Sequence, residues 1–278
     1  MERNNLIKKS LAFAVILLFI GLAFAPSINA NVSKASQEDE LVKITTEVCG
    51  LNGGKQTIKL TQDEMEEVKA LFDSIREKLD ATESREEGED IFKEAVLELD
   101  KYGLLGDLSI KQAQRLVTGG YQNIRIMKIL RRMIDGNQNI NNSSLLCLTA
   151  GHATNSFIIG PLVFLSLIGI LFPVFSNLWV FIFTYFPLAP FGLMVFGDYS
   201  IGQHAVFYPA EGWIRTIGLT GFKKWDGKFY GQLLRIDILL GGLFLGGIGF
   251  TGLRINYGFL NTFFLGSTLI LKIGPKHL

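Results

Sequence analysis

The stretch SFIIGPLVFLSLIGILFPVFSNLWVFIFTYFPLAPFGLMVFG, residues 156–197, decides the fold that the sequence predicts. It lies within a run from Gly136 to Gly197 that holds no Asp, Glu, Lys or Arg, although 19% of the whole chain is charged. Two apolar segments, 156–172 and 178–196, flank the turn-like residues 173–177. Since about 20 apolar residues span a bilayer as a helix, the stretch predicts a transmembrane helical hairpin over 156–197.

The alternative for this stretch is the fully buried core of a soluble protein. It is disfavoured because a run of this length without charge would have no face for solvent. Pro187 and Pro190 would kink or end the second helix and leave backbone groups in need of partners.

The amino end has the pattern of a secretory signal peptide. Arg3, Lys8 and Lys9 precede an apolar stretch over 11–25, and small or polar residues follow up to Ala30. We therefore expect a signal peptide over 1–30, with an uncleaved anchor as the alternative. Either form exports the next segment, so the predicted location is the plasma membrane with the N-terminal domain exported.

Charge is distributed in blocks along the first half of the chain. Residues 31–110 hold 20 acidic and 10 basic residues, whereas residues 111–135 hold 6 basic residues and 1 acidic residue. We expect an acidic exported α+β head over 31–120 and a basic amphipathic helix with a polar linker over 121–155. The basic side chains proposed to contact lipid head groups are Arg125, Lys128, Arg131 and Arg132. The alternative is that this helix packs on the head.

Local signals in the head predict a strand pair followed by three helices. Strands are expected over 41–48 and 56–60, joined by a glycine turn. The capping box Thr61-Gln-Asp-Glu64 predicts the start of a first helix. An apolar stripe follows at helical spacing, formed by Met65, Val68, Phe72, Ile75 and Leu79. Similar caps at Ser84 and Ser109 predict the second and third helices.

The C-terminal part, residues 198–278, predicts a Gly- and aromatic-rich β module at the membrane interface. A Gly-Leu-Thr-Gly turn, residues 218–221, is expected after a strand over 213–217, and Asp226-Gly227 between aromatic-rich runs predicts a β-hairpin turn. The aromatic side chains proposed to bind a partner are Trp213, Trp225, Phe229 and Tyr230. Taken together, the expected fold class is an α+β membrane protein with a small helical exported head, a two-helix transmembrane hairpin and a β-rich C-terminal module.

No arrangement of residues in the sequence points to catalysis, a cofactor or a metal. Gly247-Ile-Gly-Phe-Thr-Gly252 matches a dinucleotide-binding pattern in letters only, because no acidic residue follows Asp237. His152, His204 and His277 are scattered and show no metal-ligand spacing. We therefore expect no enzyme, no cofactor and no nucleic-acid partner.

The two cysteines, Cys49 and Cys147, leave two possibilities open. Both fall in the segment expected outside the cell, where a disulfide between them would persist and close a long loop. Leucines surround Cys147, so two buried free thiols are the other possibility.

Two functions from different classes follow from these patterns. The layout of signal, acidic head and membrane hairpin is similar to that of many prokaryotic envelope proteins, and it carries no residue-level assignment. The favoured hypothesis is a membrane-anchored cell-envelope protein that acts as a binding or structural module, with the lipid bilayer and another envelope or membrane protein as partners. The alternative is a small-solute transporter or an auxiliary subunit of a membrane complex.

Overall fold

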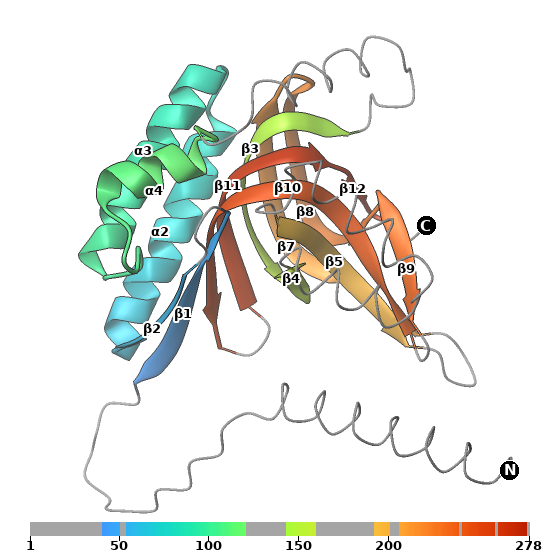
Figure 1. The fold of residues 1–278 in the computed structure, drawn as a ribbon, viewed down its shortest axis with the longest axis horizontal. Helices are drawn as coiled ribbons and strands as arrows, with labels where there is room; N and C mark the ends of the chain where they lie inside the picture. Colours follow the sequence, from blue (N-terminus) through green and yellow to red (C-terminus); the bar gives the residue numbers. More distant parts are fainter. Residues whose placement is uncertain are drawn as a thin grey trace, which may run out of the picture. The chain divides into compact units, whose positions relative to one another are not determined.

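The computed structural model describes residues 41–50, 54–120, 143–159, 192–200, 206–238, 241–258 and 261–276, all within one compact unit, Asp39–Leu278. Three helices pack against one face of a curved antiparallel sheet (Figure 1). The helices are α2 (Gln62–Asp80), α3 (Arg85–Lys101) and α4 (Ile110–Val117). The strands are β1 (Val42–Cys49), β2 (Lys55–Leu60), β3 (Ser144–Thr154), β4 (Ser156–Ile159), β5 (Gly192–Ser200), β6 (Val206–Tyr208), β7 (Ala210–Gly218), β8 (Gly221–Gly231), β9 (Leu234–Ile238), β10 (Gly241–Tyr257), β11 (Asn261–Leu271) and β12 (Ile273–Gly274).

The three helices begin where the capping residues predict. The hydroxyl of Thr61 accepts from the amide of Glu64, and the Glu64 carboxylate accepts from the amide of Thr61, which completes a capping box. Ser84 and Ser109 cap α3 and α4. The predicted apolar stripe of α2 is buried at all five positions. The predictions for these three helices are therefore confirmed.

The strands follow the order β12-β8-β7-β3-β11-β10-β1-β2, and β4, β5, β6 and β9 pair off this path. Strand β9 follows β8 closely in the chain and pairs with the first half of β10. The series of paired strands from β8 to β10 therefore curves until its two ends lie close together. Figure 1 shows this curvature, with α2, α3 and α4 all on the outer side. The curved sheet therefore buries side chains on both of its faces.

Neighbouring residues along the strands alternate between two buried clusters, as side chains of a strand must. The helix-side core joins apolar residues of the three helices to one face of the sheet, and it includes Phe72, Phe92, Leu99, Trp213, Leu253, Phe263 and Leu265. The inner core fills the other face, and it includes Cys147, Phe196, Ile214, Phe229, Phe250 and Phe264. The helices and the sheet consequently share one hydrophobic core.

The predicted α+β membrane fold with a transmembrane helical hairpin is wrong. The two ends of the 156–197 stretch form strands β4 and β5, which pair antiparallel with Ser156 opposite Phe196; residues 160–191 lie outside the described part. No helix among the described residues is long and apolar enough to cross a membrane. The described protein is mostly antiparallel sheet with three helices, so the membrane and transmembrane assignments have no support.

The error has a physical cause. A strand that is buried on both faces reads as a continuous apolar run, because neither face needs polar side chains. In β5, the four successive residues from Met194 to Gly197 are all buried, and none of them is charged. Short runs of this kind cannot be distinguished from buried helices by periodicity.

The predicted hairpin turn at Asp226-Gly227 is also wrong, although the β character of this region is confirmed. Both residues lie inside β8, where Asp226 pairs with Trp213 and Gly227 pairs with Gly212. The chain reverses at Leu219 and Thr220, between the paired residues Gly218 and Gly221, which confirms the turn expected over residues 218–221. The φ of Gly227 is +86°, a backbone conformation that favours glycine, so this residue makes the strand locally irregular without ending it.

Candidate functional site

A cavity of about 320 Å³ lies between α2 and the sheet at the border of the helix-side core. Five elements contribute to its wall: α2, β3, β7, β10 and β11. The residues that line it are Lys69, Phe72, Asp73, His152, Trp213, Tyr257 and Asn261. The cavity therefore combines three aromatic rings with an imidazole, an amide and two side chains of opposite charge.

Strand register places the sheet residues of this cavity together. His152 of β3 lies opposite Trp213 of β7 on one side and opposite Phe263 of β11 on the other. Tyr257 of β10 lies opposite Asn261 of β11. Since directly paired residues project to the same face, these side chains all lie on the face that the helices cover.

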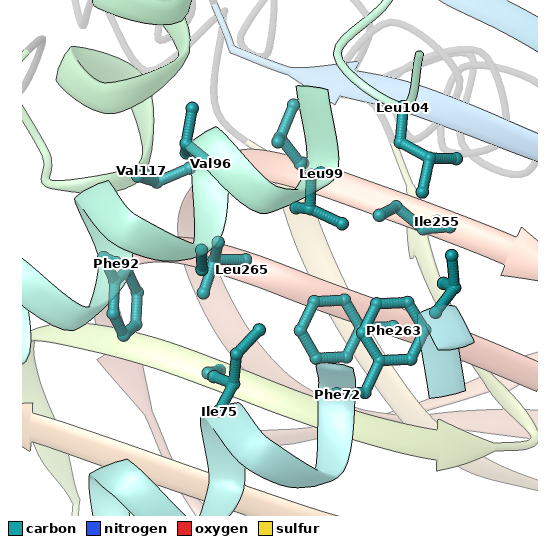
Figure 2. Close-up of a cluster of buried hydrophobic side chains, with 14 of the residues drawn as sticks. Phe72, Ile75, Phe92, Val96, Leu99, Leu104, Val117, Ile255, Phe263 and Leu265 are labelled. Carbon is teal, nitrogen blue, oxygen red and sulfur yellow. The ribbon is translucent and has the colours of Figure 1, made fainter. Parts of the chain in front are cut away.

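Helix α2 supplies the remaining wall because Lys69, Phe72 and Asp73 have the spacing of one helix face. The ring of Phe72 stacks on the ring of Phe263, with centroids 3.8 Å apart and planes 6° apart. Figure 2 shows these two rings side by side among the aliphatic side chains of the helix-side core. The stack holds the helix against the sheet, and Phe72 also lines the cavity.

His152 is the chemically most informative residue of the cavity. Its Nε2 atom is buried and has no hydrogen-bond partner among the described residues. Nearly all buried polar atoms in folded proteins have a partner, so such an atom requires an explanation. The imidazole also stacks on the Tyr257 ring, with centroids 5.7 Å apart and planes 18° apart.

Burial sets the protonation states of both rings. It lowers the pKa of His152 below its usual value of 6.5, although a hydrogen bond with Asn261 and the charge of Asp73 act in the opposite direction. Burial also raises the pKa of Tyr257, and the Asp73 carboxylate adds to this effect. At neutral pH the cavity therefore presents a neutral imidazole and a neutral phenol.

The two charged residues lie at the mouth of the cavity. Both Lys69 and Asp73 are exposed, and the only ion pair that the described residues give Asp73 is a 4.0 Å contact with Arg76. No ion pair joins Lys69 to Asp73 within the described part of the chain. Both charges are therefore available to a molecule that enters the cavity.

The four aromatic residues proposed as a binding surface have different surroundings. Trp213 is 4% exposed and lines the cavity. Phe229 belongs to the inner core, and Tyr230 packs in a separate aromatic cluster with Phe244. Trp225 is half-buried at a second cavity. The structure thus brings one of the four, Trp213, to the candidate site.

The second cavity has a volume of about 420 Å³ and lies at β8 and β12. Its lining residues are Lys223, Lys224, Trp225, Gln232, Ile273, Gly274 and Pro275. Both of its cations already have partners, because Lys223 donates to the Ser143 carbonyl and Lys224 pairs with Asp80. It is for this reason the weaker of the two candidate sites.

Both cysteines are free thiols in the structure, which is one of the two possibilities that the sequence left open. Cys49 pairs with Gly252, Gly252 with Gly266, and Gly266 with Thr149, two residues from Cys147. Two strands therefore separate the cysteines, a distance of about 14 Å along the sheet. A disulfide requires Cα atoms within roughly 7 Å of each other.

The four basic residues proposed to contact lipid, Arg125, Lys128, Arg131 and Arg132, lie outside the described residues, as does the predicted signal peptide. Within the described ranges, no group of three or more His, Cys, Asp or Glu side chains could hold a metal ion. The G-x-G-x-x-G match at Gly247 lies within β10, with no helix after it.

The sequence did not indicate six of the seven cavity residues as site residues: Lys69, Phe72, Asp73, His152, Tyr257 and Asn261. One usable signal was present, because Leu148, Ala150 and His152 occupy alternate positions as on one face of a strand. A comparison of the chain with protein-family models, with curated proteins and with solved structures finds no match.

Proposed function

We propose that the Asp39–Leu278 unit is a binding module that takes a small molecule with a hydroxyl-bearing aromatic ring in the cavity at His152. The observation that carries this proposal is that His152, whose buried Nε2 has no partner in the described part of the chain, lines a cavity with three aromatic rings. A ring hydroxyl would supply the missing hydrogen bond, and Phe72, Trp213 and Tyr257 would contact the ring.

The cavity dimensions agree with a small ligand. A volume of about 320 Å³ falls at the lower end of the range of roughly 300–1,000 Å³ that is typical of small-molecule sites. The site combines three aromatic rings with polar side chains that would orient a ligand, and both kinds of group occur in such sites.

The predicted signal peptide over 1–30 lies outside the described residues, so the structure does not test it. Export of this module therefore stays part of the proposal. Binding to another envelope protein also stays a prediction. The transporter or auxiliary-subunit alternative was motivated by Pro187, Pro190 and the glycine-rich segments. The two prolines lie outside the described residues, and the glycine-rich residues 241–252 belong to β10.

The test is calorimetric titration of the full chain with p-cresol, a neutral probe that carries a ring and a hydroxyl. We expect measurable binding, and we expect His152→Leu to weaken it about fivefold, because one hydrogen bond is worth about 1 kcal/mol. The matched control is Trp225→Leu at the second cavity, which should leave the affinity unchanged.

Thermal unfolding of each variant must first show that the fold is retained. Absence of binding tighter than about 1 mM to the folded wild type would refute the proposal. Equal affinity of wild type and His152→Leu would refute the assigned role of His152.

A further inference from the structure

The mouth of the cavity carries one positive and one negative side chain on the same face of α2. Lys69 and Asp73 are four residues apart, so their Cβ atoms are separated by about 6 Å. Opposite charges at this spacing commonly pair on a helix surface, yet no ion pair joins them in the described residues. The contact of Asp73 with Arg76, at 4.0 Å and with the Asp73 side chain 62% exposed, is weak competition for a ligand.

The two charges discriminate between ligands of different net charge. A purely cationic ligand would be attracted by Asp73 and repelled by Lys69. A purely anionic ligand would be attracted by Lys69 and repelled by Asp73. A ligand that carries an ammonium group and a carboxylate on adjacent atoms can satisfy both. The interior adds no opposing charge, because His152 is neutral at pH 7 and Tyr257 keeps its proton.

We propose that the cavity takes a zwitterionic aromatic amino acid with a ring hydroxyl, whose ammonium group contacts Asp73 and whose carboxylate contacts Lys69. This inference rests on the proposed function, which supplies the site for the ring and its hydroxyl. It assigns a role to the two charged lining residues that the ring alone does not use.

The test compares four probes that share one ring and differ in charge. They are p-cresol, tyramine, 3-(4-hydroxyphenyl)propionate and tyrosine, which are neutral, cationic, anionic and zwitterionic at pH 7. In calorimetric titrations of the full chain at low salt, we expect tyrosine to bind about tenfold more tightly than each of the other three.

Two variants assign the two contacts. Lys69→Gln should weaken the binding of tyrosine about threefold without weakening the binding of tyramine. Asp73→Asn should weaken the binding of tyrosine about threefold without weakening the binding of 3-(4-hydroxyphenyl)propionate. Glu66→Gln, an exposed charge change on α2 outside the cavity lining, is the matched control and should change none of the four affinities.

The outcomes separate this inference from the proposed function. Equal affinities for all four probes would overturn the zwitterion assignment and leave the ring site intact. Tyramine binding as tightly as tyrosine would overturn it in favour of a cation site. Failure of all four probes to bind the folded protein would overturn both proposals together.

Discussion

Arg215 shows how a single buried residue connects the helices to the sheet. Its side chain is 4% exposed, and its guanidinium makes two bonds to the Asp80 carboxylate, of 2.7 and 3.0 Å, and one of 3.0 Å to Asp226. Asp80 ends α2, whereas Arg215 and Asp226 lie on β7 and β8. A buried guanidinium without a carboxylate would be costly, so this network fixes the end of the helix on the sheet.

The network predicts a pH dependence of stability. The hydrogen bond and charge of Arg215, helped by Lys224, lower the pKa of Asp80 from 3.8 to about 2. A carboxyl group whose pKa is lower in the folded state stabilises the fold above its unfolded value and loses that contribution as the pH falls through the folded value. We therefore expect stability to fall between about pH 4 and pH 2 as Asp80 takes up a proton.

The Asp80→Asn variant tests the contribution of this carboxylate. Partial exposure of Asp80 reduces the effect of its pKa shift, so we expect a loss of about 1 kcal/mol at pH 7 and a weaker pH dependence below pH 4. Urea denaturation at several pH values measures both quantities. The control is Asp90→Asn, which removes an exposed partner of Lys93 and should change stability little. Equal pH profiles for Asp80→Asn and wild type would contradict the assignment.

At the scale of elements, β10 and β11 depend on a pair of facing glycines. Gly252 lies opposite Gly266, and a Cβ atom added at Gly266 would lie 2.1 Å from the carbonyl oxygen of Thr251. The obstacle is backbone, so it cannot move aside as a flexible side chain could. We expect Gly266→Ala to force the two strands apart and to lower the free energy of unfolding by about 1 to 3 kcal/mol.

Gly54 provides the matched control for this substitution. A Cβ atom added there meets nothing within 4 Å, so Gly54→Ala should be close to neutral. Chemical denaturation of the two variants measures the difference. A neutral Gly266→Ala would show that the strands can separate at no cost, contrary to the close pairing of β10 and β11.

The same scale explains which elements the sequence predicts. The helices are predicted by local signals, namely a capping residue such as Thr61 and an apolar stripe such as that from Met65 to Leu79. Both signals lie within a few helical turns of each other. Strands β3 and β5 give no such signal, because the helices or the rest of the sheet cover both of their faces. Their burial depends on distant residues, so the sequence predicted a polar linker at β3 and a membrane helix at β5.

At the scale of the molecule, the candidate site joins segments that are far apart in the chain. Trp213 was one of the four aromatic residues proposed to bind a partner, but its neighbours Phe72, His152 and Tyr257 come from other elements. Only the strand order and register bring them together. No local pattern encodes that order, which is why the sequence predicted one member of the site and not the site.

The shared helix-side core predicts that helices and sheet unfold in a single transition, and the two cysteines can report on it. Burial raises the pKa of Cys49 to about 12 and that of Cys147 to about 11, so both thiols stay protonated and unreactive in the folded protein near pH 8. Cys147 lies on β3 within the inner core, and Cys49 lies on β1 and packs against the same core. Labelling of each thiol therefore reports the opening of a different strand.

The Cys49→Ser variant keeps only Cys147, and the Cys147→Ser variant keeps only Cys49. In each variant, brief labelling of the remaining thiol across a urea series should give the same unfolding midpoint as far-UV circular dichroism. Each variant is its own control, because any loss of stability moves both measurements together. If Cys49 became reactive at a lower urea concentration than Cys147, each relative to its own dichroism midpoint, the strand pair β1–β2 would open separately from the sheet. The packing of Ile44 against Leu253, Ile255 and Tyr257 within the same core leads us to expect a single transition.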